Sequence, residues 1–314
     1  MWCRNSKVTL KDSTMREGLD VPGVALDVGQ KMLLLRRLAE VGVSEVEIVA
    51  PGYFDRDIST LKEMGAFDLS IKLSGLIYGN RPVWREQIKM AKGVLDRFDI
   101  LMPLSNLRPP ADRVEKSSQM KEVLKYALDN GAEAGVGFPH ATQVEHGFLL
   151  EICQQAVETG AKRITLYDTN GSSDPWSVEE LIRPIRALAE IQICFHAHND
   201  LGMATANSLA AVLAGADCLD VTVNGLGDRA GNASLEQVAV ALYLKGVSHD
   251  VRLDLLRELS RVVEEMTHVP VSKLAPIVGD FAFCQKSPSH LESPALFEAF
   301  EPALVGTIRS VCNG

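Results

Sequence analysis

The sequence lacks the marks of several large protein classes. No apolar run reaches about 20 residues without a charge, so we expect no membrane-spanning helix. The N-terminal residues contain no apolar segment typical of a signal peptide. Acidic residues outnumber basic ones by 41 to 32, which gives a formal net charge of −9 over 314 residues. Because an acidic surface repels phosphate and no Lys/Arg cluster stands out, no nucleic-acid partner is expected.

Closely spaced cysteine pairs are absent, and so are the signatures of several catalytic sites. The six cysteines lie far apart and form no Cys-x-x-Cys pair. In a chain of this length we expect them to be reduced thiols, which predicts a cytoplasmic protein. No Walker loop and no Ser/His/Asp nucleophile elbow occurs. The turn after the first expected strand, residues 14–18, is not the glycine-rich phosphate cradle that opens most doubly wound nucleotide-binding sheets.

What the sequence does contain is a regular alternation of short β-rich runs with longer amphipathic runs. Its apolar content of 46 % argues against disorder. Eight strand–helix units are complete by about residue 246, and this number of units in this length predicts a (β/α)8 TIM barrel. A doubly wound sheet is the alternative. The expected strands are 8–14, 45–50, 69–78, 98–102, 134–138, 164–169, 193–199 and 219–224. Helical periodicity is clearest in 28–41, 115–129, 143–159, 177–189 and 204–214.

The last part of the chain differs from the barrel units. A boundary is expected near residues 246–250, followed by a helical run over 253–266 and a proline-rich stretch over 269–314. We therefore predict a catalytic barrel over residues 1–246 and a C-terminal extension over 247–314, which forms an arm or small subdomain.

Active sites of such barrels lie at the C-terminal ends of the strands, so polar residues there matter most. The seventh strand ends with His196 and His198, which point the same way because side chains alternate along a strand. Two imidazoles at a strand end suit a divalent metal. The alternative is a pair of core histidines that bond to neighbours.

The first strand ends with Arg16 and Glu17. Glu17 is a possible oxygen ligand, and Arg16 a group that polarises a carbonyl oxygen or clamps a carboxylate. A surface ion pair is the simpler interpretation of the two residues alone. Closure of the barrel favours the first interpretation, since only the eighth strand, about 10 Å in all, separates the first strand from the seventh.

Other strand ends supply weaker candidates. Asn232 is a possible fourth metal ligand or a helix N-cap, and Thr169, with Asp168, is placed to hold a substrate carboxylate or to cap a turn. Arg108 is placed to bind an anionic substrate group or to face solvent. The roles of His140 and His146 stay open. The residues around His290 are typical of a loop and by themselves indicate no function for it.

Three long motifs resemble those of the DRE-TIM metallolyase family, which includes isopropylmalate, homocitrate and citramalate synthases and the hydroxymethylglutaryl-CoA lyases. Residues 12–18 resemble its D-[ST]-T-L-R-[DE]-G signature, with Met15 in place of Leu. Residues 196–204 resemble H-x-H-[ND]-D-x-G-x-A, and residues 224–232 resemble N-G-[IL]-G-[ED]-R-A-G-N. Residues 279–290 are similar to the synthases' G-x-N-A-F-x-H-x-S-G-x-H segment, with Gln285 in place of a usual His.

The resemblance implies an activity and a set of roles. The activity is condensation of acetyl-CoA, or another acyl-CoA, with a 2-oxo acid by a metal-dependent acyltransferase that forms a homodimer with swapped arms. Arg16 would stabilise the carbonyl oxygen, Thr169 would bind the substrate carboxylate, and His290 would be the catalytic histidine given to the neighbouring subunit's barrel. The divalent metal, which is Zn, Mn, Co, Fe or Mg, would be held by Glu17, His196, His198 and Asn232.

Two alternatives remain beside the synthase hypothesis. A carbon–carbon lyase or aldolase would use the same metal site without His290, but the lyases carry a reactive cysteine in the glycine loop and none lies between Cys218 and Cys284. A barrel that binds a ligand without turnover is the second. It is suggested by residues 138–142, which read Phe-Pro-His-Ala-Thr where the synthases have F-S-x-E-D.

The resemblance also bears on regulation. The sequence stops before the regulatory domain of many isopropylmalate synthases, so feedback control of that kind is not expected.

Overall fold

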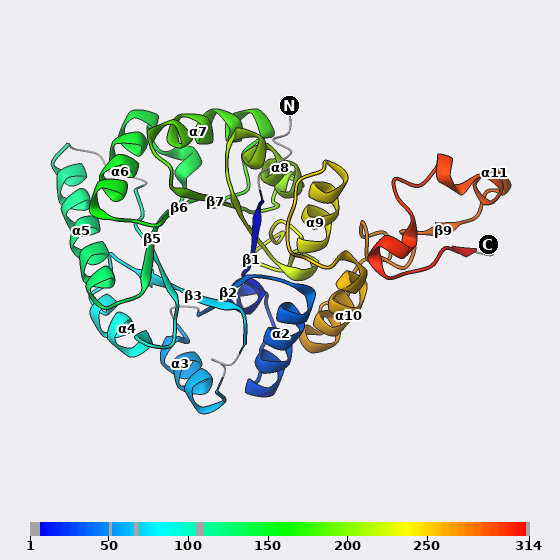
Figure 1. The fold of residues 1–314 in the computed structure, drawn as a ribbon, viewed down its shortest axis with the longest axis horizontal. Helices are drawn as coiled ribbons and strands as arrows, with labels where there is room; N and C mark the ends of the chain where they lie inside the picture. The colour runs from blue at the N-terminus through cyan, green and yellow to red at the C-terminus, as the bar shows by residue number, and fades with distance from the viewer. Residues whose placement is uncertain (1–6, 50–51, 66–68, 105–109, 312–314) are drawn as a thin grey trace.

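The computed structural model describes residues 7–49, 52–65, 69–104 and 110–311. Eight parallel strands close into a barrel in the order β1 to β8, with β1 paired to both β2 and β8. Helices surround it (Figure 1). This confirms the predicted TIM barrel and shows that the doubly wound alternative is wrong. The strands are β1 Thr9–Asp12, β2 Glu45–Val49, β3 Lys72–Tyr78, β4 Arg97–Leu101, β5 Glu133–Phe138, β6 Arg163–Asp168, β7 Gln192–Ala197 and β8 Cys218–Val221.

The helices follow their local end signals. Asp27 caps the first long helix by accepting from the Gln30 backbone N–H, and Gly42 ends that helix in the left-handed conformation. The helices are α1 Thr14–Glu17, α2 Val28–Val41, α3 Phe54–Glu63, α4 Trp84–Ala91, α5 Pro110–Asp129, α6 His146–Thr159, α7 Pro175–Leu188, α8 Ala204–Ala214, α9 Leu235–Leu244, α10 Leu256–Thr267 and α11 Pro288–Glu292. None of the helices in the described parts of the chain is long and apolar enough to cross a membrane.

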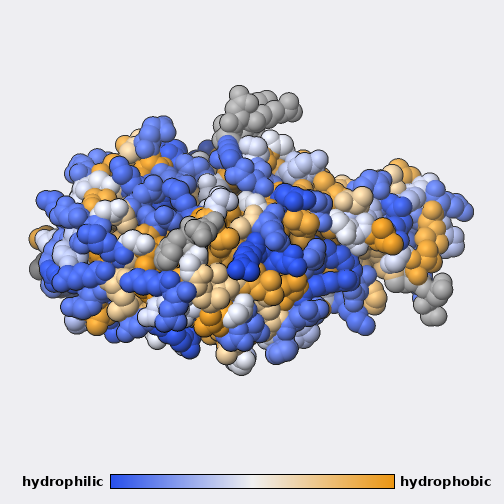
Figure 2. Space-filling model, turned by 60° about the horizontal axis from the view of Figure 1, so that its bottom comes forward, coloured by the Kyte–Doolittle hydropathy of each residue, from blue (hydrophilic) through white to orange (hydrophobic). Residues whose placement is uncertain are grey.

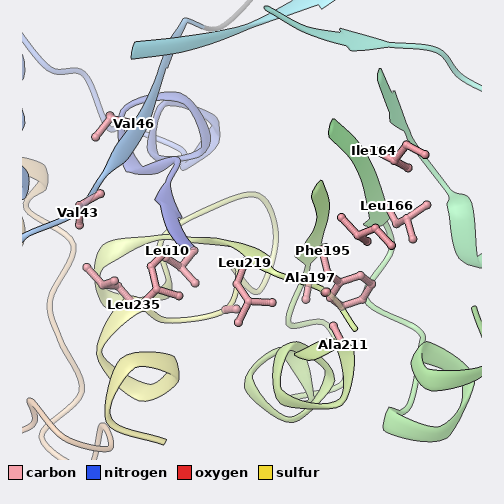
Figure 3. Close-up of a cluster of buried hydrophobic side chains, with 14 of the residues drawn as sticks. Leu10, Val43, Val46, Ile164, Leu166, Phe195, Ala197, Ala211, Leu219 and Leu235 are labelled. Atoms are coloured by element: carbon pink, nitrogen blue, oxygen red, sulfur yellow. The ribbon is translucent and has the colours of Figure 1, made fainter. Parts of the chain in front are cut away.

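The outward face of the barrel strands is apolar. Figure 3 shows Leu10, Ile164, Phe195 and Leu219 pointing from their strands toward the surrounding helices, and all four are buried. Ala211 of α8 and Leu235 of α9 belong to the same buried cluster. Removal of this apolar surface from water holds the ring of helices on the barrel.

The inward face of the same strands carries a buried network of charges. Lys11 donates to Glu47, Asp99 and Asp220, which come from three other strands. Farther toward the N-terminal ends of the strands, Arg163 donates to Glu45. Burial alone would raise the pKa of Glu45, but Arg163 and Arg97 hold that pKa below its ordinary value. Every one of these buried carboxylates therefore has a cationic partner, as buried charges require.

The chain beyond α10 forms an arm, defined here as residues 269–311, that projects from the side of the barrel (Figure 1). In it β9 Cys284–Gln285 pairs in parallel with β10 Ser310–Val311. Figure 2 shows hydrophobic residues on the surface of this part, and Leu274, Leu296 and Ile308 are each about four-fifths exposed, at 79, 80 and 83 %. The division into residues 1–246 and 247–314 stays a prediction.

The cysteines depart from expectation at one position. Cys153, Cys194 and Cys218 are buried free thiols, as predicted. Cys284 in the arm is disulfide-bonded, so the expectation of six reduced thiols is wrong for that residue.

Candidate metal centre and active site

The two histidines of β7 meet at the C-terminal end of the barrel, which we call the mouth. His196 is the fifth residue of the strand, and His198 follows its end. Both side chains are buried, and their Nε2 atoms lie 3.1 Å apart. The period of two thus places both imidazoles on the inward side, as predicted, because Phe195 and Ala197 face the helices.

Glu17 joins the two histidines from the other side of β8. It ends α1, a single turn that begins just after β1, and its Oε1 lies 3.4 Å from His196 Nε2. One donor atom each of Glu17, His196 and His198 lies within 4.8 Å of the others. The surface ion pair considered for Arg16 and Glu17 is wrong, since both residues are buried.

Asn232 completes the group. It pairs with His198 in an isolated antiparallel bridge, and its Nδ2 lies 3.2 Å from His196 Nε2. The glycine loop allows this approach, because a Cβ on Gly227 would lie 2.1 Å from Asn232 Oδ1. Asn232 is not a helix N-cap, since Ser234 caps α9.

The donor set fits a divalent cation. Burial, and secondarily repulsion from His196, lowers the pKa of His198 to about 3. Burial also lowers the pKa of His196, although Asp220 opposes the shift. Both imidazoles are therefore neutral at pH 7, which is the form that binds metal. Asn232 Oδ1 is buried and has no hydrogen-bond partner among the described residues, so this oxygen is also free to coordinate a metal ion.

Behind the histidines lies an acid that the sequence analysis missed. Asp220 Oδ2 is 3.1 Å from His196 Nδ1, and the same carboxylate accepts from Lys11 Nζ and from Ser13 Oγ. Such a carboxylate fixes the tautomer of the imidazole and leaves Nε2 free for a metal. The sequence does contain a signal for Asp220. It is an acidic residue between Leu219 and Val221, two apolar residues that point outward from the same strand.

Arg16 is held by a second missed acid. Its Nε donates to Glu47 and its Nη1 to Glu17, whereas Nη2 is buried without a partner in the described part of the structure. Burial would lower the pKa of Arg16, but Glu47 keeps that pKa above its ordinary value. The guanidinium is thus a fixed cation beside the candidate metal ligands, and one of its nitrogens is available to a bound molecule.

Thr169 is half-buried just beyond β6. Its Oγ1 accepts from the backbone N–H of His140, 2.8 Å away, so the unusual segment after β5 contacts the predicted carboxylate-binding residue. Its carbonyl accepts from Arg229, which also pairs with Asp200. Asp168 accepts from the backbone N–H groups of Ser172 and Ser173, so it caps a turn.

Two of the predicted site residues, His290 and Arg108, are not seen beside the group of Glu17, His196 and His198 in the described part of the chain. His290 lies on α11 in the arm, where its ring stacks on Phe297 at 3.9 Å and its Nδ1 lies 3.0 Å from Gln285 Oε1. Figure 1 shows α11 on the far side of the arm from the barrel. Arg108 falls outside the described residues.

Comparison with known proteins identifies the family of the chain. The HMGL-like family model matches residues 7–263. The chain belongs to the HMGL-like family. This confirms the DRE-TIM resemblance seen in the motifs.

Two relatives and one solved structure illustrate the range of the family. The chain is 36 % identical to the 2-isopropylmalate synthase of Sulfolobus acidocaldarius, over 99 % of this chain and 82 % of that protein. It is 32 % identical to a putative (R)-citramalate synthase of Archaeoglobus fulgidus, over 98 % of this chain and 64 % of that protein. The HMG-CoA lyase of Brucella melitensis matches with a TM-score of 0.70 at 18 % identity, covering 84 % of this chain and 99 % of that one, which shows a shared fold.

Proposed function

We propose that this protein is a metal-dependent acyltransferase that condenses acetyl-CoA with a 2-oxo acid to give a 2-hydroxy dicarboxylate and free CoA. The observation that carries the proposal is the buried group of Glu17, His196 and His198 in the barrel mouth. The synthase names of the most similar relatives support the reaction class.

Glu17, His196, His198 and Asn232 would hold a divalent ion, for which Zn, Mn, Co, Fe and Mg are candidates. When bound, the ion supplies Lewis-acid polarisation of the acceptor's keto group. Arg16 Nη2, the buried donor without a protein partner, stabilises the charge that develops on the keto oxygen. Glu47 keeps the guanidinium in place for this role.

Thr169 binds the carboxylate of the 2-oxo acid. Its Oγ1 already accepts a hydrogen bond from His140 N–H, but a hydroxyl also donates one, and a carboxylate only accepts. The two interactions are therefore compatible. That Arg108 contacts an anionic group of the substrate stays a prediction.

His290 of the partner subunit removes a proton from the methyl group of acetyl-CoA. Gln285 Oε1 accepts from His290 Nδ1, which leaves Nε2 as the base. The methylene carbanion then forms a bond to the keto carbon, and the keto oxygen takes up a proton to become the 2-hydroxyl group. Water hydrolyses the thioester to release CoA. The exposed apolar side chains Leu274, Leu296 and Ile308 support a swapped homodimer in which the arm is covered. We place the enzyme in the cytoplasm.

Release of CoA thiol, with acetyl-CoA, a panel of 2-oxo acids and several divalent ions, tests the proposal. Thiol release with at least one acceptor, lost on chelation of the metal, is the expected result. No release with any acceptor would overturn it. A His290→Ala variant that keeps full activity would favour the lyase alternative, and a purified protein that takes up no divalent ion would favour a non-catalytic barrel.

A further inference from the structure

Tyr167 occupies an inward position of β6 beside the metal-binding group. In the sheet register it pairs with His196 on β7, and its ring centroid lies 4.8 Å from that of the imidazole, tilted by 43°. The residue is buried. Its neighbours on the same strand, Leu166 and Asp168, face the other way. The phenol therefore projects into the mouth rather than toward the helices.

The ring is tightly confined. It packs with Leu76 of β3 and Leu101 of β4 in a small apolar cluster separate from the main core. Gly137 on the adjacent strand β5 makes room for it, since a Cβ there would lie 2.8 Å from Tyr167 Cε2 and 3.4 Å from its hydroxyl oxygen. The position of the hydroxyl is thus set by packing on three sides.

The hydroxyl itself is an unused donor. Its oxygen is buried and has no hydrogen-bond partner in the described residues. A buried polar group without a hydrogen-bond partner is unfavourable, so such a group requires a bound ligand or water. The apolar neighbours Leu76 and Leu101 offer no acceptor, and the carboxylates of Glu47 and Asp99, which act on the phenol electrostatically, make no hydrogen bond to it in the described structure.

A second unused donor flanks the same pair of metal ligands. Arg16 contacts Glu17, Tyr167 contacts His196, and Glu17 lies 3.4 Å from His196. Arg16 Nη2 and the Tyr167 hydroxyl are therefore two buried, unpaired donors on residues that contact the same pair of metal ligands. One is a fixed cation and the other a neutral phenol.

We propose that the Tyr167 hydroxyl donates a hydrogen bond to the keto oxygen of the bound 2-oxo acid, beside Arg16. Negative charge grows on this oxygen as the new carbon–carbon bond forms, so the hydrogen bond is stronger in the transition state than in the bound substrate. Tyr167 gives up no proton in that step. The inference rests on the proposed function and adds to it a substrate-contacting residue.

The Tyr167→Phe variant, which keeps the ring and its packing, tests the role of the hydroxyl. We expect kcat to fall about 10- to 100-fold, the size of a lost hydrogen bond to a charged oxygen, with KM for the acceptor nearly unchanged. Metal content should equal that of the wild type. Tyr126→Phe is the matched control, because Tyr126 packs on Trp84 away from the mouth and its loss should leave kcat unchanged.

An optical measurement gives a readout besides turnover. Binding of the acceptor without acyl-CoA should perturb the tyrosine absorption of wild type and of Tyr126→Phe, and the Tyr167→Phe variant should lose this difference signal. Gly137→Ala, which displaces the ring but keeps the hydroxyl, should also lower kcat.

The outcomes separate the two proposals. A wild-type protein that releases no CoA with any acceptor overturns the proposed function. An active wild type whose Tyr167→Phe variant keeps its kcat and the difference signal overturns the inference and assigns the hydroxyl to a buried water. A rise in KM with unchanged kcat also overturns it, because the contact would then be equal in ground and transition states.

Discussion

Two histidines of this protein, His196 in the barrel mouth and His290 in the arm, each have a side-chain oxygen close to Nδ1, at 3.1 and 3.0 Å, but their surroundings are opposite. His196 is fully buried against Asp220, which also binds Lys11 within the charged interior of the barrel. His290 is half-buried, and its partner Gln285 is neutral. Gln285 is in turn held by Glu298, which pairs with Arg309.

The comparison separates a histidine that is surrounded by the barrel of its own chain from a histidine that is held by the arm alone. In the mouth, the partner of the histidine is a buried charge whose place is set by strands β1 and β8 of the closed barrel. In the arm, the corresponding hydrogen bonds of Gln285, Glu298 and Arg309 stay within the arm and, among the described residues, reach no barrel strand. Metal binding should therefore be a property of the single chain, and proton transfer a property of the dimer.

Removal of a metal ligand should have the largest effect. His198→Ala leaves Glu17 and His196 as the strongest donors, so metal affinity should fall by more than about 100-fold, beyond the effect usual for an outer-shell partner. Activity should become undetectable. Metal content after gel filtration measures this, with His249→Ala as control, because His249 contacts the Ala239 carbonyl away from the mouth. A His198→Ala protein with full metal content would show that the group is not a metal site.

Replacement of His290 should lower activity and leave metal binding intact. His290→Ala removes the proposed general base, so the rate should fall about 10²- to 10⁴-fold, while the metal content of the variant should match that of the wild type.

Mixing two inactive variants sharpens this contrast. If the arms are swapped, equal amounts of His290→Ala and His198→Ala, after dissociation and reassociation, form heterodimers with one intact site and recover roughly a quarter of wild-type activity. No recovery, although heterodimers form, would show that each chain supplies its own His290.

The partner of His196 should matter less than the ligand itself. Asp220→Asn keeps the shape but removes the charge that orients the imidazole, so metal affinity should fall about 10- to 100-fold. A competition titration with a chelator measures it. Asp217→Asn is the control, since Asp217 lies just before the same strand and pairs with Arg186. Equal affinities of Asp220→Asn and wild type would remove Asp220 from the metal site.

The sequence predicts the barrel because each strand alternates with a helix and the eight units fit one closed sheet. The period of two places His196 and His198 together, and closure brings Glu17 to them. Expected strand ends differ from the observed ones by up to three residues, as at 72 and 221, because pairing and bulges end a strand as much as composition does.

The roles of the acidic residues behind the site could not be predicted from the sequence. Glu47 and Asp220 are visible as acidic residues between two apolar neighbours in their strands, but which cation each one meets depends on the register of the closed barrel. Lys11, for example, reaches carboxylates from β2, β4 and β8 at once. The role of His290 comes from family resemblance alone, since nothing in the spacing of a proline-rich arm connects it to the mouth.

The neutral partner in the arm should give the smallest effect. Gln285→Ala removes one neutral hydrogen bond to His290, worth about 1 kcal/mol, so kcat should fall about fivefold with metal content unchanged. Ser289→Ala, next to His290 on α11, is the control for disturbance of the short helix. Gln285→His, which supplies a ring nitrogen to the same Nδ1, should recover part of the loss. A Gln285→Ala effect as large as that of His290→Ala would mean that the arm positions its base as rigidly as the barrel positions His196.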